Sequence, residues 1–159
     1  MIGSNELTLS ADDYDKAFTE VSFLLDMLVA TITAFVGKST PSLGVASGRK
    51  MAVNMPVRMV EKTPEVAVSE LVRVFRMQQM DINGRFEGAE AVISMHDCPI
   101  GSVCRNRKMQ LGTEVCQIFH YYIAGIVAEL SGCAARPKTL TMGEHCTFTL
   151  TFSAARTLP

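Results

Sequence analysis

The sequence has no tryptophan, no long run of charges of one sign and no Cys-x-x-Cys pair. Its net charge of −1 argues against a nucleic-acid surface, which needs a concentrated basic patch. Residues 2–6 lack the basic start and apolar run of a signal peptide, and the most apolar segment, 21–36, contains Asp26 and is short for a membrane span. Five cysteines, an odd number, favour reduced thiols over a disulfide framework. We therefore expect a cytoplasmic protein that does not enter a membrane.

A chain of 159 residues with 48% apolar residues predicts a single domain, 1–159, with a substantial core. Residues 1–9 are expected to form a loose lead-in, and 10–77 a helical part with three helices. Ser10 followed by Asp12 and Asp13 is typical of a helix start, as is the run Thr63-Pro64-Glu65. A shorter helix is predicted over 42–54, where glycines weaken the pattern.

The first helix has apolar residues spaced four and three apart over three heptads. They are Tyr14, Phe18, Val21, Leu25, Leu28, Ile32 and Phe35. This row, called the heptad seam below, fits two structures: a long core helix, or a helix shared between two subunits. The second structure predicts a homodimer that forms through the N-terminal helix.

After residue 79 the pattern changes to alternation, which predicts a hairpin over about 80–97 and a second one over 138–153 around Gly143-Glu144. Between them, residues 114–131 are apolar on nearly every face and predict a long buried helix, with Thr113 as its N-cap. We therefore predict an α+β domain in which 80–153 supplies an antiparallel sheet of about four strands, built from two hairpins, and the central helix.

Ala124, Gly125 and Ala128 make a strip of small residues on this predicted central helix. Side chains this small allow a second element to approach the helix closely.

The candidate chemistry lies in cysteine and histidine residues that are far apart in the sequence. Cys98 ends a predicted strand, Cys116 and His120 lie one helical turn apart, and Cys146 is on the inner face of the last strand. If the central helix crosses the sheet, these four side chains converge as possible ligands of zinc or an iron–sulfur cluster. The alternative is that the thiols only fill space in the core.

A cysteine-dependent, hydrolase-like enzyme is a further possibility, with Cys98 or Cys116 as nucleophile and His120 as base. No glycine-rich oxyanion turn accompanies either cysteine, so we lean away from an enzyme.

The chain also contains the materials of an apolar pocket for a small organic ligand. Methionine and aromatic side chains would line it: Met51, Met55, Phe75, Met95, Phe119, Tyr122 and Phe148. The same residues could equally form an ordinary core.

Several short motifs between residues 89 and 153 resemble the 4-vinyl-reductase-type family, small-molecule (hydrocarbon-binding) domains. The motifs are Asp97-Cys98-Pro99, Glu114-Val115-Cys116 with His120, Ala124-Gly125, Leu130-Ser131-Gly132 and Gly143-Glu144-His145-Cys146-Thr147-Phe148. The resemblance implies an α+β fold, ligand sensing rather than turnover, and dimers. It places Cys98, Cys116 and Cys146 on the family's cysteines and His120 on a recurring helix position. The chain departs from the family at 138–141, where many members have an acidic residue and another cysteine.

Together these features predict a non-catalytic binding or sensor domain with a small hydrophobic ligand and a possible zinc or iron–sulfur site. The alternatives are the cysteine-dependent enzyme and a dimeric assembly or scaffold protein that works through its heptad seam.

Overall fold

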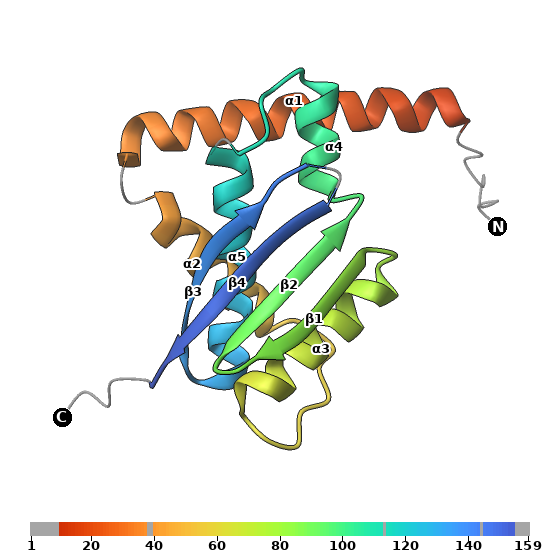
Figure 1. The fold of residues 1–159 in the computed structure, drawn as a ribbon. Coiled ribbons are helices and arrows are strands. Elements are labelled where there is room, and N and C mark those ends of the chain that lie inside the picture. Colours follow the sequence, from red (N-terminus) through yellow and green to blue (C-terminus); the bar gives the residue numbers. More distant parts are fainter. Residues whose placement is uncertain (1–9, 38–39, 113, 144, 155–159) are drawn as a thin grey trace, which may run out of the picture.

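The structure, a computed structural model, describes residues 10–37, 40–112, 114–143 and 145–154. Three helices come first: α1 (Ala11–Val36), α2 (Thr40–Ala52) and α3 (Pro64–Met77). The hairpin of β1 (Asp81–Glu87) and β2 (Glu90–His96) follows, then α4 (Pro99–Asn106), the central helix α5 (Glu114–Ser131), and the hairpin of β3 (Ala134–Thr141) and β4 (His145–Ser153). The predicted α+β fold, with N-terminal helices and a four-stranded antiparallel sheet, is confirmed (Figure 1).

Local signals in the sequence define most of these elements. Ser10 caps α1 through a capping box with Asp13, and the Thr63 side chain accepts a hydrogen bond from the Val66 N–H at the start of α3. The predicted cap Thr113 and Glu144 of the predicted turn lie outside the described residues.

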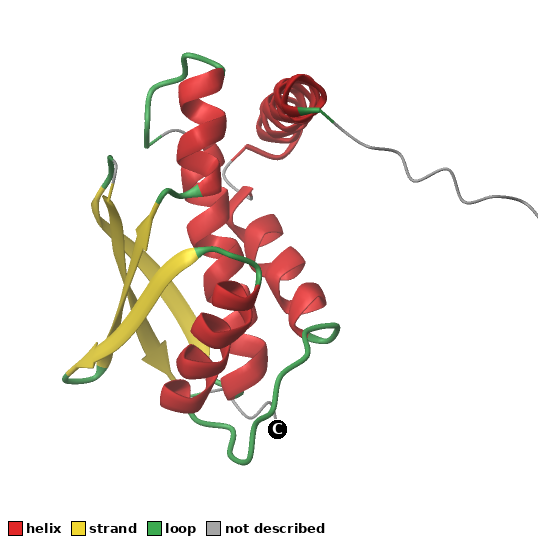
Figure 2. Ribbon diagram, turned by 90° about the vertical axis from the view of Figure 1, so that its right-hand side faces the viewer, coloured by secondary structure: helices red, strands yellow, loops and turns green. Residues whose placement is uncertain are grey.

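The two hairpins join through their inner strands, which gives the sheet order β1-β2-β4-β3. In the β2–β4 pairing, Met95 lies opposite Cys146, and in the β3–β4 pairing, Thr139 lies opposite Phe148. Figure 2 shows the helices on one side of the sheet, and no described element covers the other face. The covered face is the apolar one, as alternation along the strands requires.

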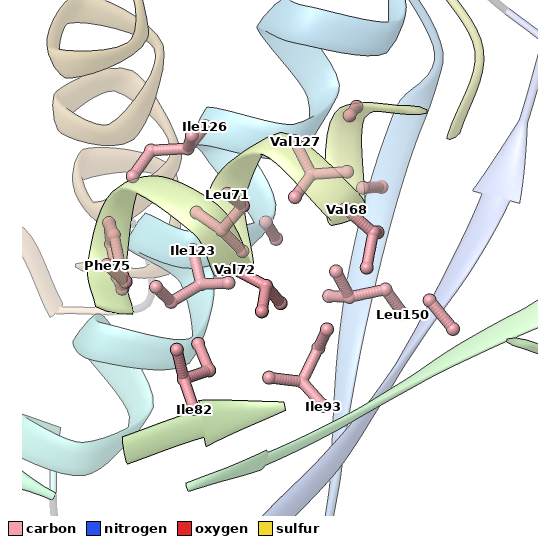
Figure 3. Packing of buried hydrophobic residues seen from close by; sticks show 14 of the residues in the cluster. Val68, Leu71, Val72, Phe75, Ile82, Ile93, Ile123, Ile126, Val127 and Leu150 are labelled. Atoms are coloured by element: carbon pink, nitrogen blue, oxygen red, sulfur yellow. The ribbon is translucent and has the colours of Figure 1, made fainter. Parts of the chain in front are cut away.

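The main core lies between this covered face of the sheet and the helices α3 and α5 (Figure 3). Its labelled members are Val68, Leu71, Val72 and Phe75 of α3, Ile82, Ile93 and Leu150 of the sheet, and Ile123, Ile126 and Val127 of α5. Burying such side chains is worth about 1.5–3 kcal/mol each. This packing holds α5 firmly across the sheet.

Helix α2 packs on α5 at very short range because both helices present glycine at the crossing. A Cβ on Gly48 would lie 2.0 Å from the Tyr122 carbonyl oxygen, and a Cβ on Gly125 would lie 2.2 Å from that of Val45. The small-residue strip of α5 thus meets a second element, as expected, and the glycines of α2 are required by that contact.

Helix α1 crosses the end of the domain where α4 ends and α5 begins, away from the sheet (Figures 1 and 2). Among its described side chains, Ser22 and Val29 are buried, whereas Tyr14, Val21 and Leu28 of the heptad seam are exposed. The prediction of an ordinary core helix is therefore wrong for this chain by itself, because most of the seam side chains that the structure describes are exposed.

Candidate functional site

A small cavity of about 20 Å³ lies where the start of α4, the first turns of α5 and the β3–β4 turn meet. Its lining combines apolar side chains, three thiols and one imidazole. The lining residues are Cys98, Ile100, Gly101, Leu111, Cys116, Phe119, His120, Met142, Gly143 and Cys146. The four predicted metal ligands, Cys98, Cys116, His120 and Cys146, therefore face the same cavity.

His120 is the polar group at the centre of this site. Its Nδ1 is 2.8 Å from Thr139 Oγ1 and its Nε2 is 3.2 Å from Cys146 Sγ, while its ring stacks on Phe148 with 4.3 Å between centroids. Helix α5 supplies the imidazole and β3 supplies the Thr139 hydroxyl. Strand β4 supplies both the Cys146 thiol and the Phe148 ring. Three elements thus fix the orientation of one buried imidazole.

Burial determines the protonation of the site. Loss of solvent lowers the pKa of His120 to about 4, so the imidazole is neutral at pH 7. Burial likewise raises the pKa of the Cys98 thiol, and it raises the pKa of Cys146 to about 11. A thiolate–imidazolium pair between Cys98 and His120 is therefore disfavoured, which weighs against Cys98 as the nucleophile of a cysteine-dependent enzyme.

A further thiol, that of Cys104, lies beside Cys116 of the cavity lining. Cys104 of α4 is buried, with its Sγ 4.0 Å from Cys116 Sγ, whereas Cys133 is partly exposed and is not part of the cavity lining. Three thiols and an imidazole are chemically suited to zinc or iron. In the arrangement of the described residues, however, no group of three or more His, Cys, Asp or Glu side chains could hold a metal ion. A metal site here stays a prediction.

The predicted pocket residues lie in different parts of the fold. Phe119 lines the cavity, and the ring of Phe148 stacks on the His120 ring. The others lie in or around the core: Phe75 and Met95 are buried, Met55 and Tyr122 pack at its edge, and Met51 is exposed.

No signal in the sequence identifies Thr139 as the partner of His120, or Leu111 and Met142 as parts of the cavity wall. The alternation along β3 could have nominated Thr139 only if the strand order had been known. Leu111 and Met142 lie in connecting segments, where periodicity gives no information about position.

Comparison with known proteins supports this fold. No family model matches the chain, and no curated protein matches it in sequence. The crystal structure of the phenol-responsive sensory domain of the transcription activator PoxR with phenol is similar in structure, with a TM-score of 0.57. It is 14% identical, and the match covers 84% of this chain and 73% of that chain. The chain thus has an α+β fold that a small-molecule sensory domain also uses.

Proposed function

We propose that this chain is the non-catalytic, ligand-binding part of a sensor, and that a small, largely apolar molecule binds beside His120. The observation on which the proposal rests is a neutral, buried imidazole held by Thr139 at an otherwise apolar cavity. Binding sites for small molecules usually combine apolar walls with a few polar groups that fix orientation. The shared fold with a phenol-responsive sensory domain supports the same interpretation.

The hydrogen bonds of His120 suggest the chemistry of the ligand. A neutral imidazole has one donor and one acceptor nitrogen, and the tautomer decides which of them faces Cys146. A hydroxyl group can donate or accept, so it can replace the Cys146 thiol as the partner of Nε2 with either tautomer. We therefore propose a small aromatic or aliphatic molecule with one hydroxyl group, and phenol as the first compound to test.

The cavity must enlarge to admit such a molecule. Its volume of about 20 Å³ is enough for one water molecule, whereas a cavity that takes benzene measures about 150 Å³. In the cavity wall formed by Ile100, Leu111 and Met142, Ile100 belongs to the short helix α4 and packs at the edge of the main core, whereas Leu111 and Met142 belong to connecting segments. We propose that this wall moves on binding while α5 and the sheet stay in place.

The first test is a calorimetric titration of phenol into the wild-type protein and into His120→Phe. The variant keeps an aromatic ring at position 120 that can stack on Phe148, but it removes the hydrogen bond to the ligand. We expect saturable binding by the wild type and a Kd at least about tenfold higher in the variant, equivalent to about 1.4 kcal/mol.

The matched control is His145→Phe, which makes the same substitution at an exposed histidine beside Cys146. Phenol should bind this variant as it binds the wild type. Equal affinities for all three proteins would contradict the proposed role of His120. A thermal melt of each variant shows whether the fold has survived the substitution.

A zinc ion or an iron–sulfur cluster is the second candidate ligand of the site, because all four predicted ligands line one cavity. Binding would require their side chains to turn toward a common centre. Elemental analysis of anaerobically purified protein tests this: stoichiometric zinc or iron that is lost in Cys116→Ser but kept in Cys133→Ser would establish a metal site. Metal-free protein that still binds phenol would reject it.

The remaining parts of the proposal concern relatives, assembly and location. We propose that the chain is related to the 4-vinyl-reductase-type domains, on the motif spacing around Cys98, Cys116 and Cys146 together with the fold. We further propose a cytoplasmic homodimer that forms through α1, whose exposed apolar side chains support such a contact.

A further inference from the structure

Helix α1 presents to solvent a row of large apolar side chains that the domain does not cover. Along this row, Tyr14 is 62% exposed, Val21 62% and Leu28 51%. These residues recur every seven positions, and Leu24, also exposed, lies between the last two on the same side of the helix. We call Tyr14, Val21, Leu24 and Leu28 the outward row. The body of the domain contacts the neighbouring side of α1, where Ser22 and Val29 are buried.

The spacing of the outward row indicates what covers it. A row that repeats every seven residues continues to face a second helix only if that helix runs alongside it for several turns. A second copy of α1 has the required length and the same repeat, so the contact is self-complementary. This inference rests on the homodimer proposed above, and it adds the geometry of the contact.

The distribution of charge along α1 selects the direction of pairing. The N-terminal part contains Asp12, Asp13, Asp15 and Glu20 against one basic residue, Lys16, whereas the only charged residue in 21–36 is Asp26. A parallel pair would place the two acidic ends side by side. In an antiparallel pair, each acidic end lies beside the nearly uncharged end of the other copy, so repulsion between like charges is smaller.

We propose that two copies of this chain associate through antiparallel α1 helices, with the two-fold axis between Leu24 and Leu25. This axis places Val21 of one copy opposite Leu28 of the other. With a rise of 1.5 Å per residue, the two Lys16 residues are separated by about 25 Å along the helices. In a parallel pair they would be separated only by the distance between the helix axes, about 10 Å.

A membrane is the main competing occupant of the outward row. Residues Ala11–Ala34 are long and apolar enough to cross a membrane by length and composition alone. However, α1 lies across the end of the domain and contacts α2, α4 and α5, and the centre of the Phe23 ring lies 4.8 Å from the guanidinium carbon of Arg107. A membrane span would have to give up these contacts, whereas pairing with a second copy keeps them.

The test combines association and distance measurements on the full chain. Sedimentation velocity compares the wild type with Leu28→Asp, which puts a charge in the outward row, and with Ala30→Asp, which puts the same charge on an exposed position off the row. A nitroxide attached through p-acetylphenylalanine at position 16 reports the distance between copies by electron paramagnetic resonance. Wild type and Ala30→Asp are expected to be dimers, and the dissociation constant of Leu28→Asp is expected to be higher by about tenfold or more. The distance between the two labels is expected to be about 25 Å or more.

Each other outcome overturns the inference. A dimer with labels about 10 Å apart would show parallel pairing, and a dimer that Leu28→Asp leaves intact would place the interface elsewhere. A monomer that floats with phosphatidylcholine–phosphatidylglycerol vesicles would show that a membrane covers the row. Phenol binding is measured on the same samples, so a failure of the pairing is distinguished from a failure of the cavity.

Discussion

Gly48→Ala is expected to lower the free energy of unfolding by about 3 kcal/mol, although alanine is the better helix former. The added Cβ would lie 2.0 Å from the Tyr122 carbonyl oxygen and 2.9 Å from the Ile126 backbone nitrogen. Both are backbone atoms of α5, so no side-chain rotation relieves the clash. The two helices must move apart, and the contacts along α2 and α5 weaken together.

Urea denaturation of wild type, Gly48→Ala and Gly101→Ala measures this effect. Gly101 is the matched control, because it is also buried within a helix, but a Cβ there meets its nearest atoms at 3.6 and 3.7 Å. The control should be neutral or slightly stabilising. If Gly48→Ala were as stable as the control, α2 would not cross α5 at the distance described.

Acid is expected to destabilise the protein through His120. The pKa of His120 is about 4 in the folded chain, against an ordinary value of 6.5. Between these values the unfolded chain binds the proton and the folded chain does not, so lowering the pH favours unfolding. The contribution is constant above pH 6.5 and fully lost below about pH 4, and it amounts to about 3 kcal/mol.

The measurement is the free energy of unfolding at a series of pH values from 7.5 to about 4, for wild type and His120→Gln. The variant has no imidazole at this position, so it should lose much less stability over this range. His145→Gln, at an exposed histidine, should keep the wild-type pH dependence. A parallel decline for wild type and His120→Gln would contradict a buried, neutral His120.

Helices, strands and turns could be predicted because their signals are local. The caps at Ser10 and Thr63 mark helix starts, and the alternation along β1, β2 and β4 marks strands. Their contacts depend on the order β1-β2-β4-β3, which periodicity does not give. This order brings Thr139 to His120, so that hydrogen bond could not be predicted.

The role of apolar residues was harder to predict than their position in an element. Met95 in the core and Phe119 at the cavity follow the same rules of burial, so sequence cannot assign either to a ligand. The heptad seam is similarly ambiguous, because a repeat of seven predicts a partner helix without saying which chain supplies it. For the four candidate ligands, facing the same cavity is a result of the fold, and whether they bind a metal stays a prediction.

Two parts of the chain have different roles in the proposed binding of a ligand. The sheet, α3 and α5 form the packed part that holds His120, whereas α4 and the adjoining segments form the cavity wall. Helix α4 also connects the cavity with α1. It begins at the cavity with Cys98 and is followed by Arg107, which lies over Phe23 of α1. A ligand that displaces α4 would therefore act on the helix through which two copies are proposed to pair.

A crystal structure of the protein grown with phenol would show directly whether the ligand binds beside His120. We expect the aromatic ring between Phe119 and Cys116, its hydroxyl within hydrogen-bonding distance of His120 Nε2, and the wall of Ile100, Leu111 and Met142 moved outward. A structure with phenol bound only elsewhere, or with the cavity closed at saturating phenol, would contradict this expectation.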